Sequence, residues 1–372
     1  MKGLYATKKL QNHNLYKELK DNLQKYYQLS LQKESKQKNY LASKPIINLS
    51  TGEVFKIDYE FEKEHTKYYK VIEQKIATIE HIAKSLGYTS VFMTFTLPSK
   101  FHPFKSIQKG NNRLCVGVND NFDFSTLSEA IEEGYQHLNH IVRTFYKRVK
   151  NYVGGEYLYI KVFEAHTTTI PHCHYLIFFR PEHFKDVKKT FNKVALDFKL
   201  LQTDFETARF RDGINHSTRY IMKYLTKDLK NGSDYFLIRS LDGWKRQHKI
   251  RVITTSQLSL SMYLYKKIYY SLPVEIKECI ERTIKEQKIP YYLYFQRNSY
   301  IKKRLTKIEK NETTSKSSYI GDSEAEFEIT IKSNRIRAPD NKPIYKITFL
   351  EIKHLEAIIY RSNNYLIIEN GE

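Results

Sequence analysis

Residues 158–179, LYIKVFEAHTTTIPHCHYLIFF, constrain the fold of this chain more than any other stretch. Apolar and polar residues alternate with a period of two over 158–166 and again over 172–179, which is typical of β-strands. The polar segment 167–171 ends in proline and separates the two runs. The sequence therefore predicts a β-hairpin whose strands are joined by a five-residue loop.

The expected hairpin gathers one carboxylate and three imidazoles on one face. This geometry depends on the register, which we take to be the one in which His166 pairs with His172 across the loop. Glu164 then lies opposite His174, and all four side chains point to the same side because strand side chains alternate. Directly opposed Cβ atoms are about 5 Å apart, so these groups can converge on one divalent ion. The alternative is a set of half-buried residues that hydrogen-bond within the sheet. The opposite face carries residues that can enter a core, namely Tyr159, Phe163, Tyr175, Ile177 and Phe179.

The charge of the chain favours a polyanionic partner. Its 372 residues allow a sizeable core, and 62 Lys and Arg against 41 Asp and Glu give a net charge of +21. Lysine-rich chains also arise from AT-rich genomes, so charge alone is a weak argument. The 30 tyrosines strengthen the argument for a nucleic-acid partner, because aromatic side chains among lysines stack on the bases of single-stranded nucleic acid.

The sequence also indicates a soluble protein. No apolar run approaches the roughly 18 residues that a membrane-spanning helix needs, and the first thirty residues lack a signal-peptide core. Three scattered cysteines, Cys115, Cys173 and Cys279, are too few for a disulfide framework. We therefore expect a reducing, cytosolic setting.

The segments around the hairpin predict an α+β fold. Helical periodicity over 61–86 is followed by a β-branched and aromatic strand over 90–97, and helices are expected over 125–150 and from Pro181. Gly and Asn in 104–122 indicate a loop. Just after the strand, Ser99, Lys100 and His102 place a hydroxyl, a cation and an imidazole at a sheet edge. An ordinary strand-to-loop transition is the alternative.

A second informative stretch is 217–230, STRYIMKYLTKDLK, which predicts a helix. Ser217 can cap it and Gly232 can end it. Its buried stripe is expected to consist of Ile221, Leu225 and Leu229.

Two phenols with neighbouring ammonium groups lie on this helix. Tyr220 and Tyr224 are one helical turn apart, and Lys223 and Lys227 each follow a tyrosine by three residues. One interpretation is that the tyrosines flank the apolar stripe with their hydroxyls at the surface. The other is that each phenol attacks a phosphodiester, helped by a metal and by a lysine that offsets the developing charge.

Three blocks in order resemble the motifs of rolling-circle replication initiators of the HUH endonuclease superfamily, and most of all the phage replication gene A protein family. They are MTFTLPSKFH at 93–102, FEAHTTTIPHCHYLIFF at 163–179 and RYIMKYLTKD at 219–228. The resemblance implies that His172 and His174 bind Mg²⁺ or Mn²⁺, with Glu164 or His166 as third ligand. It implies Tyr220 and Tyr224 as alternating nucleophiles.

The same resemblance implies further roles and partners. Lys223 and Lys227 would assist catalysis, and DNA contacts are assigned to Ser99, Lys100, His102 and Arg219. The expected substrate is single-stranded DNA at a replication origin, with host helicase and polymerase as further partners, in the bacterial host cytoplasm and without a membrane. The implied fold is an antiparallel sheet with helices on one face, of the ferredoxin or RRM type.

We divide the chain into five segments. Residues 1–87 are expected to be a basic helical region, 88–256 the endonuclease core, 257–310 a helical basic region, 311–324 a linker, and 325–372 a small β-rich module. The expected activity is DNA nicking and strand transfer through a 5′-phosphotyrosine. The alternatives are a transposase of the same superfamily, a non-catalytic DNA-binding protein, and an iron(II) oxygenase built on two histidines and a carboxylate.

Overall fold

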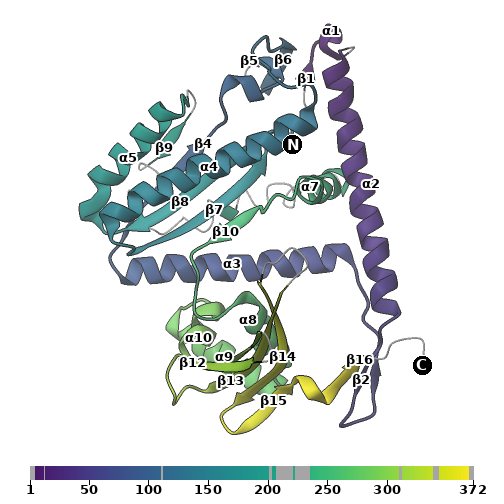
Figure 1. Cartoon of the computed structure of the whole chain (residues 1–372), viewed down its shortest axis with the longest axis vertical. Coiled ribbons are helices and arrows are strands. Elements are labelled where there is room, and N and C mark those ends of the chain that lie inside the picture. The colour runs from purple at the N-terminus through teal and green to yellow at the C-terminus, as the bar shows by residue number, and fades with distance from the viewer. Residues whose placement is uncertain are drawn as a thin grey trace. The chain divides into compact units, whose positions relative to one another are not determined.

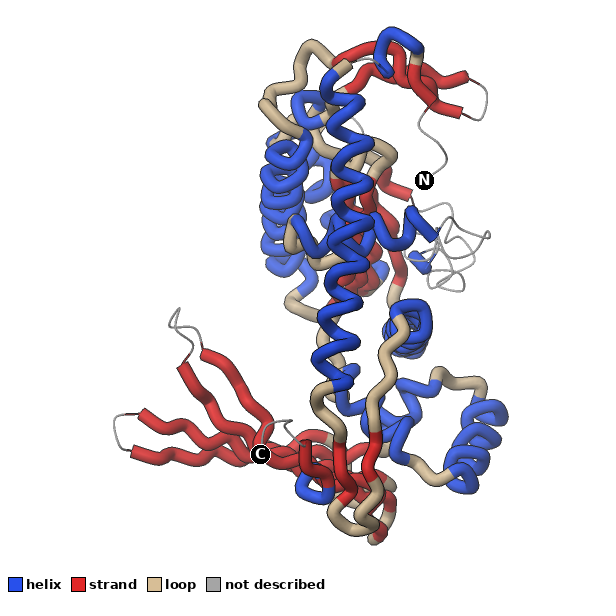
Figure 2. The backbone as a smooth tube through the Cα atoms, turned by 90° about the vertical axis from the view of Figure 1, so that its right-hand side faces the viewer, coloured by secondary structure: helices blue, strands red, loops and turns tan. Residues whose placement is uncertain are grey.

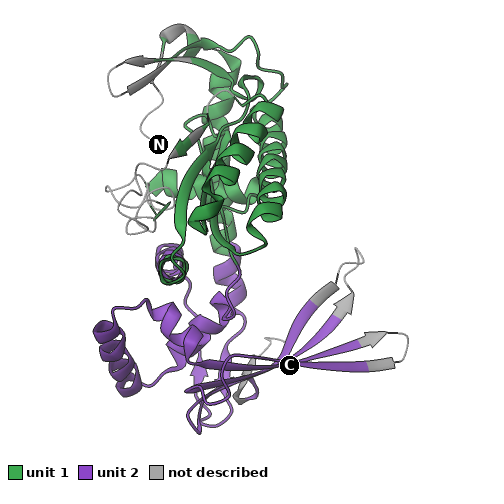
Figure 3. Cartoon of the chain, turned by 90° about the vertical axis from the view of Figure 1, so that its left-hand side faces the viewer, with its two compact units in different colours: residues 1–35, 79–256 green, residues 36–78, 257–372 purple. Residues whose placement is uncertain are grey.

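The computed structural model describes residues 5–11, 13–109, 112–200, 203–206, 221–222, 235–309, 312–337 and 343–367. The chain forms two compact units (Figure 3). Unit 1 comprises residues 1–35 and 79–256, and unit 2 comprises residues 36–78 and 257–372. The long helices α2 (Asn14–Ala42) and α3 (Phe61–Ser85) each contribute to both units.

Unit 1 is built on a five-stranded antiparallel sheet in the order β10-β7-β8-β4-β9. Its strands are β4 (Thr89–Phe95), β7 (Tyr157–Ala165), β8 (Pro171–Phe179), β9 (Asp204–Glu206) and β10 (Ile253–Thr255). Helix α4 (Leu127–Val153) runs along the sheet, and α5 (Phe184–Asp197) lies beside it after the short 3-10 turn Pro181–His183 (Figure 1). The expected α+β class is therefore confirmed.

The core of unit 1 lies between α4 and one face of this sheet. Thr126 caps α4 by accepting a hydrogen bond from the Glu129 amide, and Gly154 ends it in a left-handed conformation. Ser125, the residue before the cap, donates its main-chain amide to the Glu129 carboxylate. Sheet residues that face α4 include those predicted from the alternation, namely Tyr159, Phe163, Tyr175, Ile177 and Phe179.

The opposite face of the sheet is also covered along the middle of its strands. Phe92, Ile160, Leu176 and Phe178 point to that face, and each is at most 1% exposed. A substrate therefore cannot lie on the middle of this face. Its end, where the hairpin loop lies, carries the polar residues considered below.

The remaining described elements of unit 1 are a small sheet and a further helix. Strands β1 (Tyr5–Ala6), β5 (Phe104–Lys109) and β6 (Asn112–Val118) form a small sheet near α1 (Lys8–Gln11). The loop expected over 104–122 is thus largely the antiparallel strand pair β5–β6. Helix α7 (Tyr235–Gln247) lies against α2, where Ser240 Oγ donates to the Leu23 carbonyl and Ser30 Oγ to Asp242.

Unit 2 contains a second five-stranded sheet in the order β12-β11-β13-β14-β15. Its strands are β11 (Ser299–Glu309), β12 (Glu312–Ile320), β13 (Phe327–Arg337), β14 (Pro343–His354) and β15 (Ala357–Arg361). Helices α8 (Met262–Ser271), α9 (Val274–Gln287) and α10 (Tyr291–Arg297) precede it. A three-stranded sheet joins β2 (Ile46–Asn48), β3 (Val54–Phe55) and β16 (Tyr365–Ile367), after the 3-10 turn Ser362–Asn364.

Two expected segments differ from this arrangement. The linker expected over 311–324 is wrong, because β12 occupies most of it and pairs with β11 along its length. Both faces of β12 are exposed, so its Ser and Thr residues show no apolar alternation although they suit a strand. Strand β11 likewise lies in the segment expected to be helical, 257–310. Among the described residues, no helix has the length and apolar character needed to cross a bilayer.

Gly243 permits the close contact between α7 and α2. A Cβ atom at this position would lie 1.9 Å from the Tyr26 carbonyl oxygen and 2.4 Å from its carbon. We predict that Gly243→Ala lowers the free energy of unfolding by about 1–3 kcal/mol, because main-chain atoms cannot rotate away from the added methyl group. Urea denaturation followed by circular dichroism measures the change.

The matched control is Gly117→Ala, since a Cβ atom there meets nothing within 4 Å. We expect its stability to stay within about 0.5 kcal/mol of the parent. Equal stabilities for the two variants would contradict the close α2–α7 contact.

Candidate functional site

The hairpin of β7 and β8 is present, but its register differs from the predicted one. Glu164 lies opposite His172, and Val162 lies opposite His174. The His166 amide donates to the Ile170 carbonyl, and Thr169 adopts a left-handed φ of 66°. The expected pairing of His166 with His172 is therefore wrong by two residues, because a three-residue loop with a left-handed residue closes the hairpin earlier.

A shift of two residues leaves every side chain on its predicted face, because strand side chains alternate with a period of two. Glu164, His172 and His174 thus share the face opposite α4. The His174 Nε2 atom donates to Glu164 Oε2 at 3.0 Å, along the diagonal between the strands. Their side chains are only 7% and 19% exposed, so solvent screens this contact weakly.

Strand β4 completes the surroundings of His174. Thr94 is the cross-strand neighbour of His174, and its Oγ1 lies 3.2 Å from the ring Nδ1. With a proton on Nε2, Nδ1 accepts from the Thr94 hydroxyl, which orients the ring. Phe92 stacks on the same ring with centroids 5.5 Å apart. Thr94 was not predicted, although it lies in the first of the three motif blocks.

Two further imidazoles, from outside the paired strands, lie close to His172. Together with Glu164, His172 and His174 they form a cluster of five side chains. His166, at the start of the hairpin loop, stacks on His172 with ring centroids 4.8 Å apart and planes 8° from parallel. His102 lies 6.1 Å from the His172 ring and 6.4 Å from the His166 ring. Its Nε2 donates to the Leu97 carbonyl at 3.0 Å. His102 was expected to contact DNA, and the structure places it beside the predicted metal ligands.

Cys173 lies between the two histidines of β8 but points to the other face, into the core under α4. Complete burial raises the pKa of its thiol to about 12. The thiol therefore stays protonated at neutral pH and is not a metal ligand.

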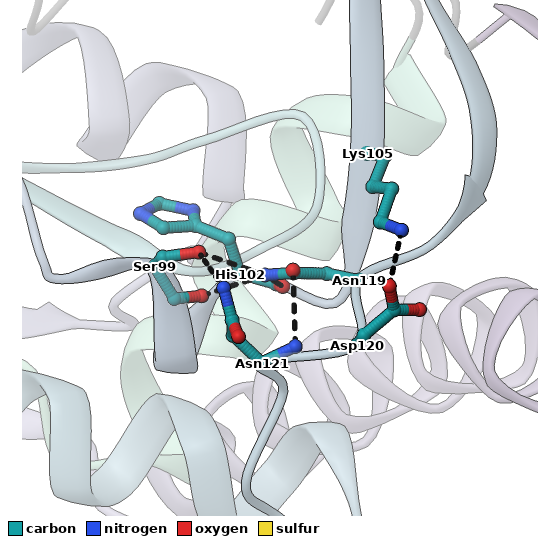
Figure 4. A network of polar contacts seen from close by, with 6 residues as sticks. All are labelled: Ser99, His102, Lys105, Asn119, Asp120 and Asn121. Atoms are coloured by element: carbon teal, nitrogen blue, oxygen red, sulfur yellow. Dashed lines mark hydrogen bonds and ion pairs between the residues drawn. The ribbon is translucent and has the colours of Figure 1, made fainter.

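Asn119 holds the turn that carries Ser99, Lys100 and His102 (Figure 4). Its side-chain amide donates to the Ser99 carbonyl at 2.8 Å, to the Ser99 hydroxyl at 3.1 Å and to the His102 carbonyl at 2.8 Å. Its Oδ1 accepts from the Asn121 amide, and the residue is only 8% exposed. Asn119 was not predicted, because the contact joins residues about twenty positions apart and no local pattern marks it.

The predicted nucleophiles lie outside the described residues. These are Tyr220 and Tyr224, with Lys223, Lys227 and Arg219. Ile221 and Met222 from the same stretch are described, and both are helical and buried. The prediction that Ile221 enters the core is thus confirmed.

The cluster contains the types of ligand atom that bind divalent cations. Imidazole nitrogens and a carboxylate suit several divalent metals, and the cluster supplies both. Among the residues that the structure describes, however, no three His, Cys, Asp or Glu side chains form a preformed metal-binding arrangement. Glu164 and His174 instead contact each other, and His166 contacts His172.

We predict that Asn119→Ala lowers the free energy of unfolding by about 1–3 kcal/mol, because it leaves carbonyls of the turn without their donor. It should also shift the NMR resonances of the His102 ring, which this turn positions. Asn121→Ala is the control, since that amide is exposed and lies 3.5 Å from Ser99 Oγ. Equal effects of both substitutions would contradict the role of Asn119.

Comparisons with known proteins extend the resemblance noted in the sequence. The family model for bacteriophage replication gene A protein (GPA) matches residues 18–231. The replication gene A protein of Escherichia phage P2 is 28% identical over 160 residues, which are 41% of this chain and 20% of the phage protein. The match thus spans about a fifth of that relative. No solved structure matches. Because the family model covers more than half of the chain, the chain belongs to the bacteriophage replication gene A protein family.

Proposed function

We propose that this protein is a metal-dependent single-strand DNA endonuclease and strand transferase of the HUH type, which initiates rolling-circle replication. The observation that carries the proposal is the gathering of Glu164, His172 and His174 on one sheet face, with His166 and His102 at their side. Membership of a phage replication protein family supports DNA as the substrate.

His172, His174 and Glu164 would hold Mg²⁺ or Mn²⁺, with His166 as the alternative to Glu164. When bound, the ion supplies Lewis-acid polarisation of the scissile phosphate. The Thr94 hydroxyl can accept a hydrogen bond from His174 Nδ1–H as well as donate one to Nδ1, so it can hold the ring while Nε2 faces Glu164. Such support of a ligating imidazole is common in metal sites.

Tyr220 and Tyr224 are the proposed nucleophiles. A phenolic oxygen attacks the phosphorus atom, the phosphorus–O3′ bond breaks, and a 5′-phosphotyrosine forms together with a free 3′-hydroxyl. A 3′-hydroxyl later attacks that phosphotyrosine and restores the phenol. Lys223 and Lys227 would offset the charge that develops on phosphate during these steps. Two phenols allow the enzyme to hold one strand while it cuts another.

DNA would enter along the turn that Asn119 holds. Ser99 and Lys100 lie on this turn and would contact phosphates, together with Arg219. His102 faces His166 and His172 directly, so we propose that it acts at the reacting phosphate as well as in binding. The partners would be origin DNA, host helicase and host polymerase, in the cytoplasm of the bacterial host.

Covalent capture tests the nucleophiles. We expect the protein, with Mn²⁺ and single-stranded DNA from its own replicon, to form a protein–DNA adduct that denaturing gels resolve. Tyr220→Phe and Tyr224→Phe should each retain an adduct, and the double variant should lose it. Tyr263→Phe is the control, because that tyrosine is 47% exposed and lies in α8. An adduct in the double variant would overturn the nucleophile assignment.

Metal titration tests the ligands separately. We expect His174→Ala to weaken Mn²⁺ binding by at least about tenfold in calorimetry, since changes at or near metal ligands commonly cost 10–100-fold. His140→Ala is the control, because it removes an exposed imidazole from α4. Unchanged affinity for His174→Ala would refute the metal site. Tight Fe²⁺ binding with 2-oxo acid turnover would favour an oxygenase instead.

A further inference from the structure

The five-stranded sheet of unit 2 has one covered face and one exposed face. Ile301, Ile329 and Ile352 lie side by side on the covered face and are at most 1% exposed. Phe327 belongs to that face and contacts Phe295 of α10, with ring centroids 5.4 Å apart. The alternate residues of the same strands therefore point away from α8–α10. Figure 2 shows the long strands of this sheet in red.

Aromatic rings mark the exposed face. Tyr300 of β11 and Tyr319 of β12 stack with centroids 6.1 Å apart and planes 11° from parallel. Tyr319 is 63% exposed, so one of its ring faces can be reached from solvent. Phe349 of β14 lies on the same face as the cross-strand neighbour of Lys332. Exposed rings on an open sheet face are the usual platform for stacking unpaired bases.

The basic residues on this face differ along the strands in whether acids neutralise them. Near the end of the sheet where β11 and β13 begin, they form ion pairs with acids, as in Lys302–Glu328 and Arg361–Glu351. Farther along, the row through β12, β11, β13 and β14 reads Ser317, Arg304, Lys332, Phe349. The next row reads Ser315, Thr306, Asn334, Lys346. Neither row contains an acid.

The direct juxtaposition of Arg304 and Lys332 is the informative feature. They are paired neighbours on adjacent strands, which lie about 4.8 Å apart, and both are exposed. Like charges that lie directly opposite destabilise a sheet, and an anion bound between them would offset that cost. The Lys332 ammonium lies over the Phe349 ring at 5.0 Å, so a cation and a stacking surface adjoin.

We propose that this face is a second nucleic-acid site, which binds single-stranded DNA. Bases stack on Tyr319, Tyr300 and Phe349, and phosphates contact Arg304, Lys332 and Lys346. Unpaired strands fit better than duplex, because the aromatic rings need bases whose faces are free. The site lies beyond the family match at residues 18–231 and does not depend on the nicking chemistry.

Photochemical crosslinking with the full chain locates the site. The probe is an oligothymidylate of about 20 nucleotides with 5-iodouracil substitutions, and Tyr220→Phe/Tyr224→Phe protein keeps the readout independent of nicking. We expect mass spectrometry to find crosslinks in the peptides that contain Tyr300 or Tyr319. Arg304→Ala/Lys332→Ala should reduce them at least about fivefold and lower the salt slope of binding by about 1.4, at roughly 0.7 per phosphate contact.

Lys303→Ala/Lys316→Ala is the matched control, because it removes two cations of the same sheet, from β11 and β12, on the other face. This control should leave the crosslinks at Tyr300 and Tyr319 unchanged. Tyr319→Phe should also retain the crosslinks, whereas Tyr319→Ala should lose those at position 319. Thermal melting checks that each variant is folded.

Crosslinks confined to unit 1 would overturn the proposal, as would equal losses in the two double variants. Equal competition by duplex DNA would also overturn it, as would retention on phosphatidylserine vesicles without crosslinking to DNA. If the wild-type protein forms no tyrosine adduct in the covalent-capture experiment but crosslinks still form at this sheet, this site stands and only the nuclease is refuted.

Discussion

The pairing of β7 with β8 is the constraint on which unit 1 depends. Its backbone hydrogen bonds set Glu164 opposite His172, and alternation then assigns each side chain to one of two faces. One face packs on α4 and supplies the core, and the other gathers the imidazoles and the carboxylate. Neighbouring residues of one strand therefore belong either to the core or to the candidate site. Cys173 illustrates this, because it is a buried core thiol between two histidines of the cluster.

The second requirement is that the turn after β4 stays in place. His102 belongs to this turn, and the Asn119 amide fixes it through contacts to two of its carbonyls. The β5–β6 hairpin brings Asn119 back to the turn. A segment with no chemistry of its own therefore positions an imidazole beside His166 and His172. The close α2–α7 contact at Gly243 is another case in unit 1 in which segments far apart in the sequence hold each other in place.

Unit 2 uses a sheet in a different way. Its covered face is apolar, whereas its exposed face carries aromatic rings and cations that no core requires. Glu164, His172 and His174 lie in unit 1, so the proposed nuclease chemistry gives this face of unit 2 no role, whereas the proposed binding of single-stranded DNA does. Unpaired bases would stack on these rings while their phosphates contact the cations.

The sequence by itself determined the α+β class, the hairpin and the side of the sheet on which Glu164, His172 and His174 lie. These follow from a period-two pattern, which is local and survives an error of two residues in register. Only the tertiary structure decided the register itself, because the left-handed conformation of Thr169 shortens the loop. It also decided the approach of His102, the role of Asn119 and the strand at β12. Each of these rests on contacts between segments that no local pattern of residues records.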